Sequence, residues 1–206
     1  MPDAGFCGVV VANELLDALP VHCFSVGEEG VQERCVSFEN GRFQWVDGEA
    51  AQNNLVQKKT LSTQLPEAIL AQLKTLPEGY QSEVNLTANG WVDAIAGMME
   101  AGVVLLIDYG FPRHEYYHPQ RNRGTLMCHY RHRAHDDPFV YPGLQDITAH
   151  VDFTAIAEAA VSAGLDVRGY NTQGFFLLAC GLTELAPQFD GGESSEQQQQ
   201  ILTAEQ

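Results

Sequence analysis

Two apolar segments of the chain, residues 8–12 and 103–107, are each followed at once by polar side chains suited to chemistry. These polar residues are Asn13, Glu14 and Asp17 after the first segment, and Asp108 and Tyr109 after the second. Unbroken runs rich in β-branched residues are typical of strands that are covered on both faces. In an open α/β sheet, ligands bind just beyond the carboxyl ends of such strands. We therefore expect these side chains to meet in one crevice.

The composition indicates a soluble globular domain with an unusual charge. The chain has 206 residues, 45% of them hydrophobic and 18% charged, and a formal net charge of −16. Binding to nucleic acid by bulk electrostatics requires clustered Lys and Arg, so this charge argues against it. The same charge disfavours an anionic membrane surface but attracts a cationic segment of a partner. We expect no nucleic-acid partner and no membrane partner.

The five cysteines are odd in number and widely spaced, and they form no CxxC pair. This pattern favours reduced thiols in a cytosol-like compartment over a disulfide framework. The first residues carry no basic region followed by a long apolar stretch, so we expect no signal peptide. No apolar run is long enough to span a bilayer.

Turn signals divide the rest of the chain. Alternating segments around Asn40-Gly41 predict a small antiparallel meander over residues 21–48. Helical spacing or capping residues predict helices over residues 66–73, 85–99, 152–163 and 175–185, and residues 165–170 are predicted to form a strand. Residues 111–145, rich in His and Arg, are predicted to be a long loop. We expect one domain over residues 1–186, followed by a polar, Gln-rich tail or linker over residues 187–206.

Several strings of the sequence resemble one enzyme family. They are VVVANELLDALPVHCF, YQSEVNL, GVVLLIDYGF, RGTLMCHYRHR, PGLQDITAHVDF and TQGFFLLACGL. Together they are similar to the MidA-like methyltransferases, which use S-adenosyl-L-methionine and include a mitochondrial assembly factor of respiratory complex I. DYG alone is a weak signal, whereas ANELLDALP followed at this distance by DITAHVDF is specific. The resemblance extends from about Gly8 to Leu185.

The resemblance implies an α/β fold, namely the C-terminal part of a class I (Rossmann-like) methyltransferase sheet with the antiparallel meander inserted. The family's first strand opens a glycine-rich loop around the cofactor, and no such loop occurs upstream of Gly8. The family also continues beyond the last residue of this sequence with a further apolar segment. We therefore expect the chain to be a fragment that lacks the glycine-rich cofactor half and the C-terminal end, and to bind the methyl donor weakly.

The resemblance also assigns roles to residues. Ala12 and Asn13 are expected on the cofactor side, and Asn13, Asp108 and Tyr109 on the substrate side. Glu14, Asp17 and His150 are the expected catalytic residues: the two acids would hold a guanidinium bidentately, and His150 would accept a proton or hydrogen-bond an acid. The alternatives are structural. Glu14 could cap a helix, Asp17 could be a solvated surface acid, Asp108 could cap the next turn, and His150 could have a structural role alone.

The basic segment 113–135 holds five of the eight arginines and five of the seven histidines. His129, His132 and His135 are three residues apart, and a helix would present at most two of them to one metal. We therefore expect no metal site, and expect this segment to pair with acids of the chain itself or of a partner.

The leading hypothesis is a methyltransferase that modifies a protein side chain, namely arginine, with a subunit of complex I as the substrate that the resemblance suggests. The competing hypotheses are a non-catalytic binding or assembly module that keeps the fold, and an acidic metal-binding protein that uses the histidines. The resemblance implies a cytoplasmic location in a bacterium and a mitochondrial one in a eukaryote.

Overall fold

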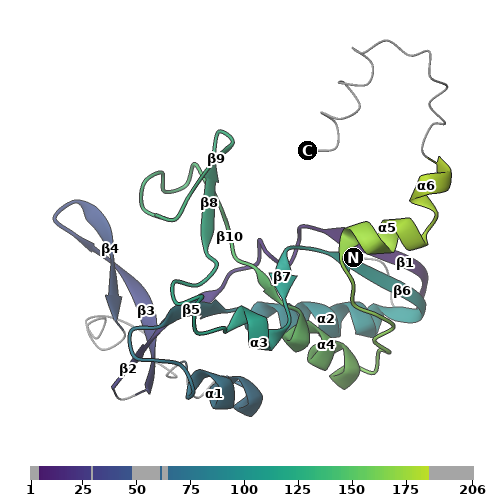
Figure 1. The fold of residues 1–206 in the computed structure, drawn as a ribbon, viewed down its shortest axis with the longest axis horizontal. Coiled ribbons are helices and arrows are strands. Elements are labelled where there is room, and N and C mark those ends of the chain that lie inside the picture. The colour runs from purple at the N-terminus through teal and green to yellow at the C-terminus, as the bar shows by residue number, and fades with distance from the viewer. Residues whose placement is uncertain (1–4, 29, 48–60, 62–64, 186–206) are drawn as a thin grey trace, which may run out of the picture. The chain divides into compact units, whose positions relative to one another are not determined.

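The computed structural model describes residues 5–28, 30–47, 61 and 65–185 (Figure 1). The chain divides into two compact units, one ending at Val167 and the other beginning at Arg168. All of the candidate site residues lie in the first unit. The polar segment 187–206, expected as a tail, lies outside the described residues.

The two apolar segments form paired parallel strands, as predicted. β1 (Phe6–Asn13) lies alongside β6 (Met99–Ile107), and the register sets Asn13 opposite Ile107. The carboxyl ends of both strands therefore coincide, which is the arrangement that brings the residues following them together.

Only one face of this strand pair is covered in the described part of the chain, so the prediction of two covered faces is not met there. Val9, Val11 and Val103 are each about 60% exposed. Leu106 points to the opposite face and packs against the cluster that α2 and α4 form. Successive residues of a strand point to opposite faces, so a cover on one side leaves every second side chain exposed.

The meander is confirmed and gains a fourth strand that the sequence pattern did not reveal. Its antiparallel strands, in the order β4-β3-β2-β5, are β4 (Arg42–Asp47), β3 (Gly30–Glu39), β2 (His22–Gly27) and β5 (Gln81–Val84). Asn40 and Gly41 have φ values of 52° and 77°, as the tight hairpin turn requires.

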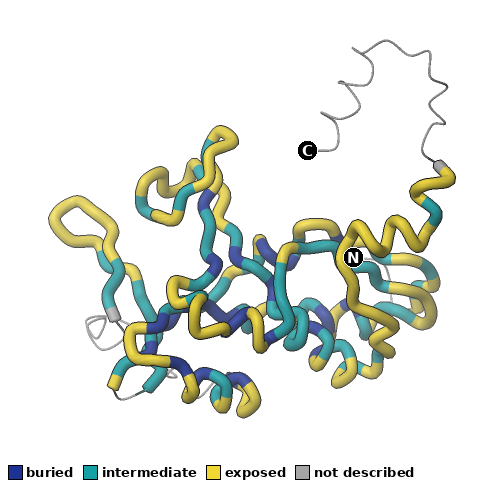
Figure 2. Tube along the Cα trace, viewed as in Figure 1, coloured by how far each residue is buried: buried dark blue, intermediate teal, exposed yellow. Residues whose placement is uncertain are grey.

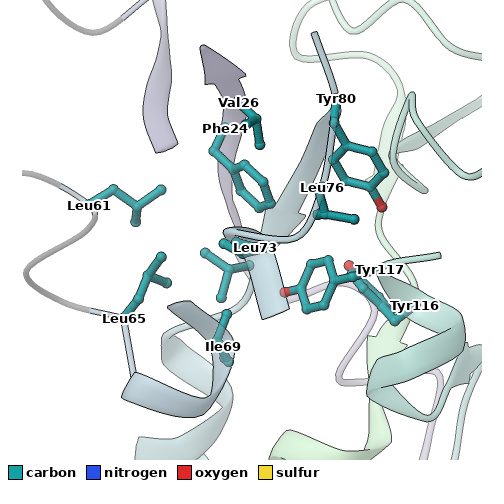
Figure 3. Close-up of a cluster of buried hydrophobic side chains, with 11 residues drawn as sticks. Phe24, Val26, Leu61, Leu65, Ile69, Leu73, Leu76, Tyr80, Tyr116 and Tyr117 are labelled. Carbon is teal, nitrogen blue, oxygen red and sulfur yellow. The ribbon is translucent and has the colours of Figure 1, made fainter. Parts of the chain in front are cut away.

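The meander packs on one of two apolar clusters. Side chains of β2, of α1 (Glu67–Leu73) and of the short helix α3 (Arg113–Tyr116) with the residue after it point toward one another in Figure 3. The most deeply buried of them are Phe24, Leu73, Tyr80 and Tyr117. This cluster fixes α3 against the meander, and so fixes the start of the basic segment.

The second cluster lies below the ends of β1 and β6. It joins α2 (Thr87–Met98) to α4 (Phe153–Ser162) through Val92, Ile156 and Leu16. Both helices were predicted from the sequence. Asp152 caps α4, as expected, because its Oδ1 accepts hydrogen bonds from the backbone N–H groups of Thr154 and Ala155.

The segment predicted to be a long loop, residues 111–145, is mostly without regular structure but is interrupted by short elements that the sequence did not reveal. These elements are β7 (Gly110–Phe111), α3, β8 (Met127–Tyr130) and β9 (Arg133–His135). β10 (Asp146–Thr148) pairs with β8, and β11 (Val151–Asp152) pairs with β7. Strands of two to four residues are too short for a readable period, and their partners lie far along the chain. Figure 2 shows the tip of the β8–β9 hairpin as exposed.

In the second unit, the single helix expected over residues 175–185 is two helices, α5 (Gln173–Ala179) and α6 (Leu182–Leu185). Gly181, with φ 87°, separates them. The predicted strand over residues 165–170 was wrong, because this segment has no regular structure and pairs with no strand among the described residues. None of the helices in the described ranges is long and apolar enough to cross a membrane.

Candidate functional site

The residues after β1 form a tight turn that separates buried from accessible side chains; we call residues 13–17 the acid turn. Glu14 adopts φ 48°, and its N–H donates to the carbonyl of Ile107 at 2.9 Å. Leu15 and Leu16 pack into the α2–α4 cluster, with Leu16 only 2% exposed. This anchoring leaves the side chains of Asn13 and Glu14 exposed at the strand ends. A positive φ in a non-glycine residue is uncommon and often marks a functional position.

Asp108, at the end of β6, holds the acid turn in place. Its Oδ2 accepts hydrogen bonds from the backbone N–H groups of Leu15, Leu16 and Asp17 at 3.1, 2.9 and 3.3 Å. Its Oδ1 accepts from the N–H of Tyr109 at 2.9 Å. Asp108 thus caps mainly the acid turn, far away along the chain, rather than the next turn as its structural alternative had it, whereas Glu14 caps nothing in the described structure. Direct substrate binding by Asp108 stays a prediction.

Asp17 is a buried acid in a negative environment. Its side chain is 7% exposed, so the alternative of a solvated surface acid is wrong. Its Oδ1 is buried without a hydrogen-bond partner in the described part of the chain. Burial raises the pKa of Asp17, and the charges of Asp108 and Glu14 raise it further. A nearby cation would stabilise the charged form of a carboxylate in this environment.

Tyr109 lies beside Glu14 at the mouth of the site. Its ring is 60% exposed, and the carboxylate of Glu14 raises the pKa of the phenol through its charge and a hydrogen bond. The phenol of Tyr109 and the carboxylate of Glu14 therefore interact directly at the coinciding strand ends.

His150 reaches the site from the β10–β11 connection. Gly110 lets β7 and β11 approach closely, since a Cβ at residue 110 would overlap the carbonyl of Val151. The imidazole stacks on Phe111 with ring centroids 5.3 Å apart, and presents its edge to Tyr109 at 6.5 Å. Burial lowers the pKa of His150, and the nearby Arg121 lowers it further. His150 is therefore a neutral imidazole at neutral pH and can accept a proton.

The basic segment is neutralised in part by the chain's own acids, as expected. Arg113 is buried and binds Asp152 through Nε at 3.1 Å and Glu158 through Nη1 at 2.9 Å. The exposed Arg123 pairs with Asp136 at 2.9 Å.

The three spaced histidines lie on or between the strands of the β8–β9 hairpin rather than on a helix. His129 is exposed on β8, His132 lies at the tip with φ 62°, and His135 lies on β9. Within the described ranges, no group of three or more His, Cys, Asp or Glu side chains is placed to hold a metal ion.

Comparison with known proteins was decisive for the family. Residues 1–171 match the sequence profile of the family described as "Putative S-adenosyl-L-methionine-dependent methyltransferase". The chain belongs to this methyltransferase family. The part of the chain that matches includes every residue of the candidate site.

Relatives in this family carry more specific names. The "Protein arginine methyltransferase NDUFAF7 homolog, mitochondrial" of Drosophila melanogaster is 30% identical over 82% of this chain and 36% of that protein. The protein of the same name from Caenorhabditis elegans is 30% identical over 88% of this chain and 39% of that protein. The chain thus spans well under half the length of these two relatives.

Solved structures of the family agree with the fold. A COG1565 superfamily member from Burkholderia thailandensis, bound to S-adenosyl-homocysteine, is 46% identical and has a TM-score of 0.78. That match covers 93% of this chain and 46% of the other. A native structure of a COG1565 superfamily protein from the same organism, also 46% identical, has a TM-score of 0.80 over 94% of this chain and 48% of the other. The α/β class expected from the sequence is confirmed.

The two residues expected to border the methyl donor, Ala12 and Asn13, lie at the carboxyl end of β1. Asn13 is exposed at the carboxyl end of β1, whereas Ala12 is only 8% exposed. In the described ranges β1 and β6 lead into the acid turn and into Asp108-Tyr109-Gly110, so neither leads through a glycine-rich turn into a helix. A cavity of about 300 Å³ between α2 and α4 is lined in part by His150 but not by Asn13 or Glu14. The described residues therefore define the acidic side of the site, at the acid turn, better than the side expected to hold the methyl donor.

Sequence reasoning brought the expected residues together but missed those that support them. Asn85 donates through Nδ2 to the carbonyl of Leu16 at 3.3 Å and accepts from the N–H groups of Thr87 and Ala88. Glu83, two residues earlier, is buried. Glu83 and Asn85 both lie in the string SEVN. The signal in the sequence that could have indicated a role for Glu83 was an acid within a strand-like segment.

Proposed function

We propose that the protein is an S-adenosyl-L-methionine-dependent methyltransferase whose acid turn holds the guanidinium of an arginine side chain in a protein substrate. One observation carries the proposal: Glu14 and Asp17 lie together at the coinciding ends of β1 and β6, and one buried oxygen of Asp17 has no hydrogen-bond partner among the described residues. Membership of the family supports the reaction type. The names of the two relatives support arginine as the acceptor.

We infer that β1 and β6 belong to a class I (Rossmann-like) sheet. In such a sheet the ligand lies beyond the carboxyl ends of the parallel strands. On this inference Ala12 and Asn13 form the edge nearest the methyl donor, and Tyr109 borders the acceptor side.

The chemistry requires positioning more than activation. The donor, when bound, supplies an electrophilic methyl group on a sulfonium. Glu14 and Asp17 would bind two nitrogens of the planar guanidinium and so fix the direction of the third. That nitrogen uses its electron pair to form the bond to the methyl carbon, while the electron pair of the carbon–sulfur bond stays on sulfur. Bringing the two reactants into line accounts for most of the rate gain.

One proton must leave the nitrogen, since the product guanidinium carries the same charge as the substrate. His150 is neutral and lies next to Tyr109, so it can take this proton directly or through water. Asp108 acts indirectly, because its two oxygens hold the backbone of the acid turn.

The test uses protein expressed from the complete open reading frame, incubated with labelled methyl donor and arginine-containing peptides. Glu14→Gln keeps the shape of the side chain but removes its charge, and we expect kcat/KM to fall about 100-fold. Glu78→Gln is the matched control, because Glu78 is an exposed acid in the same unit. The control should retain wild-type activity.

The outcomes separate the alternatives. Equal labelling by wild type and Glu14→Gln would remove Glu14 from the mechanism. Labelling of lysine or a main-chain amine instead of arginine would retain the reaction and correct the substrate. Failure of the complete protein to bind the donor would favour the non-catalytic binding or assembly module, in which the same acids bind a basic segment of a partner.

A subunit of respiratory complex I is the partner we propose from the family resemblance. A cytoplasmic site in a bacterium, or a mitochondrial one in a eukaryote, remains the expected location. Labelling of a whole-cell extract followed by identification of the labelled polypeptide tests the partner independently of the peptide assay.

A further inference from the structure

Glu83 is a charged residue placed where charges are rarely found. It lies on β5 and is 2% exposed. Its Oε1 accepts hydrogen bonds from the hydroxyl of Tyr116 at 3.0 Å, from the N–H of Thr125 at 2.7 Å, and from the hydroxyl of Thr125. Burial raises the pKa of Glu83, whereas the bonds from Thr125 and Tyr116 lower it. A buried carboxyl with three donors on one oxygen is a built feature rather than a chance burial.

The chain around Thr125 is shaped to fit this carboxyl. Gly124 has φ 73°, and a Cβ at that position would overlap Oε2 of Glu83. The N–H of Gln81 donates to the carbonyl of Asn122 at 3.0 Å, which fastens the same segment to β5. The turn at residues 122–125 therefore wraps around the Glu83 side chain, and the place of Thr125 depends on it.

Thr125 connects Glu83 to the candidate site. Its hydroxyl gives its one proton to Glu83 and accepts the backbone N–H of His150 at 2.9 Å. The two neighbouring N–H groups bind elsewhere in the site: Ala149 donates to the carbonyl of Asp17 at 3.0 Å, and Val151 donates to that of Tyr109 at 2.8 Å. Three consecutive N–H groups, which we call the 149–151 strap, thus tie the acid turn, Tyr109 and Thr125 together.

We propose that Glu83 is a positioning residue which, through Thr125 and the 149–151 strap, sets the place of His150 relative to Asp17 and Tyr109. The expected consequence for catalysis is a lower KM for the acceptor peptide, and this part rests on the proposed function. A purely structural Glu83 would affect the stability of the whole unit but not the strap in particular. The two roles are therefore separable by measurement.

Thr125→Val and Tyr116→Phe form a matched pair. Each substitution removes one hydroxyl from Oε1 of Glu83, but only the first breaks the connection to His150. The first readout is the rate of amide hydrogen exchange at His150 divided by the rate for the amides of β2, which we call the His150 ratio. Thr125→Val should raise this ratio about tenfold, as expected for the loss of one hydrogen bond, and Tyr116→Phe should not. Thr125→Ser keeps the hydroxyl and should restore the wild-type ratio.

Substitutions at Glu83 itself complete the first test. Glu83→Ala should raise the His150 ratio as Thr125→Val does, and Glu83→Gln, which keeps an acceptor oxygen, should restore it in large part. If Glu83→Ala does not fold, the Thr125 series decides. Equal ratios in Thr125→Val and Tyr116→Phe would overturn the proposal.

The second readout is kinetic and uses the arginine peptide assay. Thr125→Val should raise the KM for the peptide about tenfold and leave the KM for the donor within about twofold, because the strap borders the acceptor side. A rise in both constants, or in neither, would overturn the catalytic part. Absence of methyl transfer by the wild type would instead overturn the proposed function, and the exchange comparison, made without substrate, would still decide the positioning role.

Discussion

Two groups of acidic side chains in the same unit differ in whether a cation accompanies them. Around Arg113, the carboxylates of Asp152 and Glu158 bind one buried guanidinium. In the acid turn, Glu14 and Asp17 lie beside Asp108, and the described structure shows no ion pair to any of the three. The first group contains its own cation, and we call it the complete group, although its two carboxylates leave one negative charge in excess; the second contains no cation among the described residues.

The pKa values of Glu158 and Asp17 shift in opposite directions, whereas burial raises the pKa of Asp152 in spite of Arg113. The hydrogen bond and charge of Arg113 lower the pKa of Glu158, so that carboxyl is stabilised in its charged form. Burial and two neighbouring carboxylates raise the pKa of Asp17, so its charged form is costly. A group that is costly without its ligand is typical of a binding site, since stability there is given up for function.

The largest expected effect is from breaking the complete group. Arg113→Met should destabilise the protein by about 3 kcal/mol, because it leaves Asp152 buried without its cation. Urea unfolding at pH 7 measures the change. Arg123→Met is the control, because the Arg123–Asp136 pair is exposed and should contribute at most about 0.5 kcal/mol. Equal losses would mean that the Arg113 group is no more than a surface pair.

A smaller effect of opposite sign is expected in the acid turn. Asp17→Asn should stabilise the free protein by about 1 kcal/mol at pH 7, while lowering methyl transfer. The pKa of Asp17 is raised in the folded state above its ordinary value of 3.8, so its charge opposes folding above that pH. The gain should therefore disappear as the pH falls toward 3.8.

Asp93→Asn, on the exposed face of α2, is the matched control for Asp17→Asn and should change stability little at either pH. Unfolding of both variants at pH 7 and pH 4 provides the comparison. A destabilised Asp17→Asn at pH 7 would show that the carboxylate is already compensated, and would remove the contrast between the two groups.

The smallest effect is expected at His150. Burial and Arg121 lower the pKa of His150 below the ordinary 6.5, and a hydrogen bond with the backbone of Thr125 and the charge of Asp108 offset only part of this, so protonation of His150 opposes folding. Stability should decrease as the pH falls below 6.5, and His150→Gln should flatten that decrease. His129→Gln, at an exposed position on β8, should leave the slope as in wild type. The same slope in all three proteins would mean that His150 is not buried enough to titrate abnormally.

Much of the fold could be predicted because its signals are local. The apolar runs before Asn13 and Asp108, the turn at Asn40-Gly41 and the cap at Asp152 each lie within a few residues of what they determine. The strand predicted over residues 165–170 was wrong, and the short strands within residues 111–145 were missed, for the converse reason. Whether a short segment becomes a strand depends on a partner far along the chain, which no local pattern reveals.

The candidate site divides in the same way. Placement of acids at the ends of two parallel strands followed from the sequence, because parallel strands with matching apolar runs end at one edge. The role of Asp108 as the cap of a turn more than 90 residues away in sequence did not follow. Nor did the burial of Asp17, which depends on how Leu16 packs between α2 and α4.

The sequence by itself therefore determined which chemical groups are available. These are the acids at the strand ends, the imidazole of His150 and a net charge of −16. Only the tertiary structure decided which acids are paired with a cation and which are not, and that Thr125 joins Glu83 to His150. Hydrogen bonds and burial depend on distances in space between segments that are 25 to 93 residues apart along the chain. A linear pattern does not encode those distances, and packing of the two apolar clusters sets them.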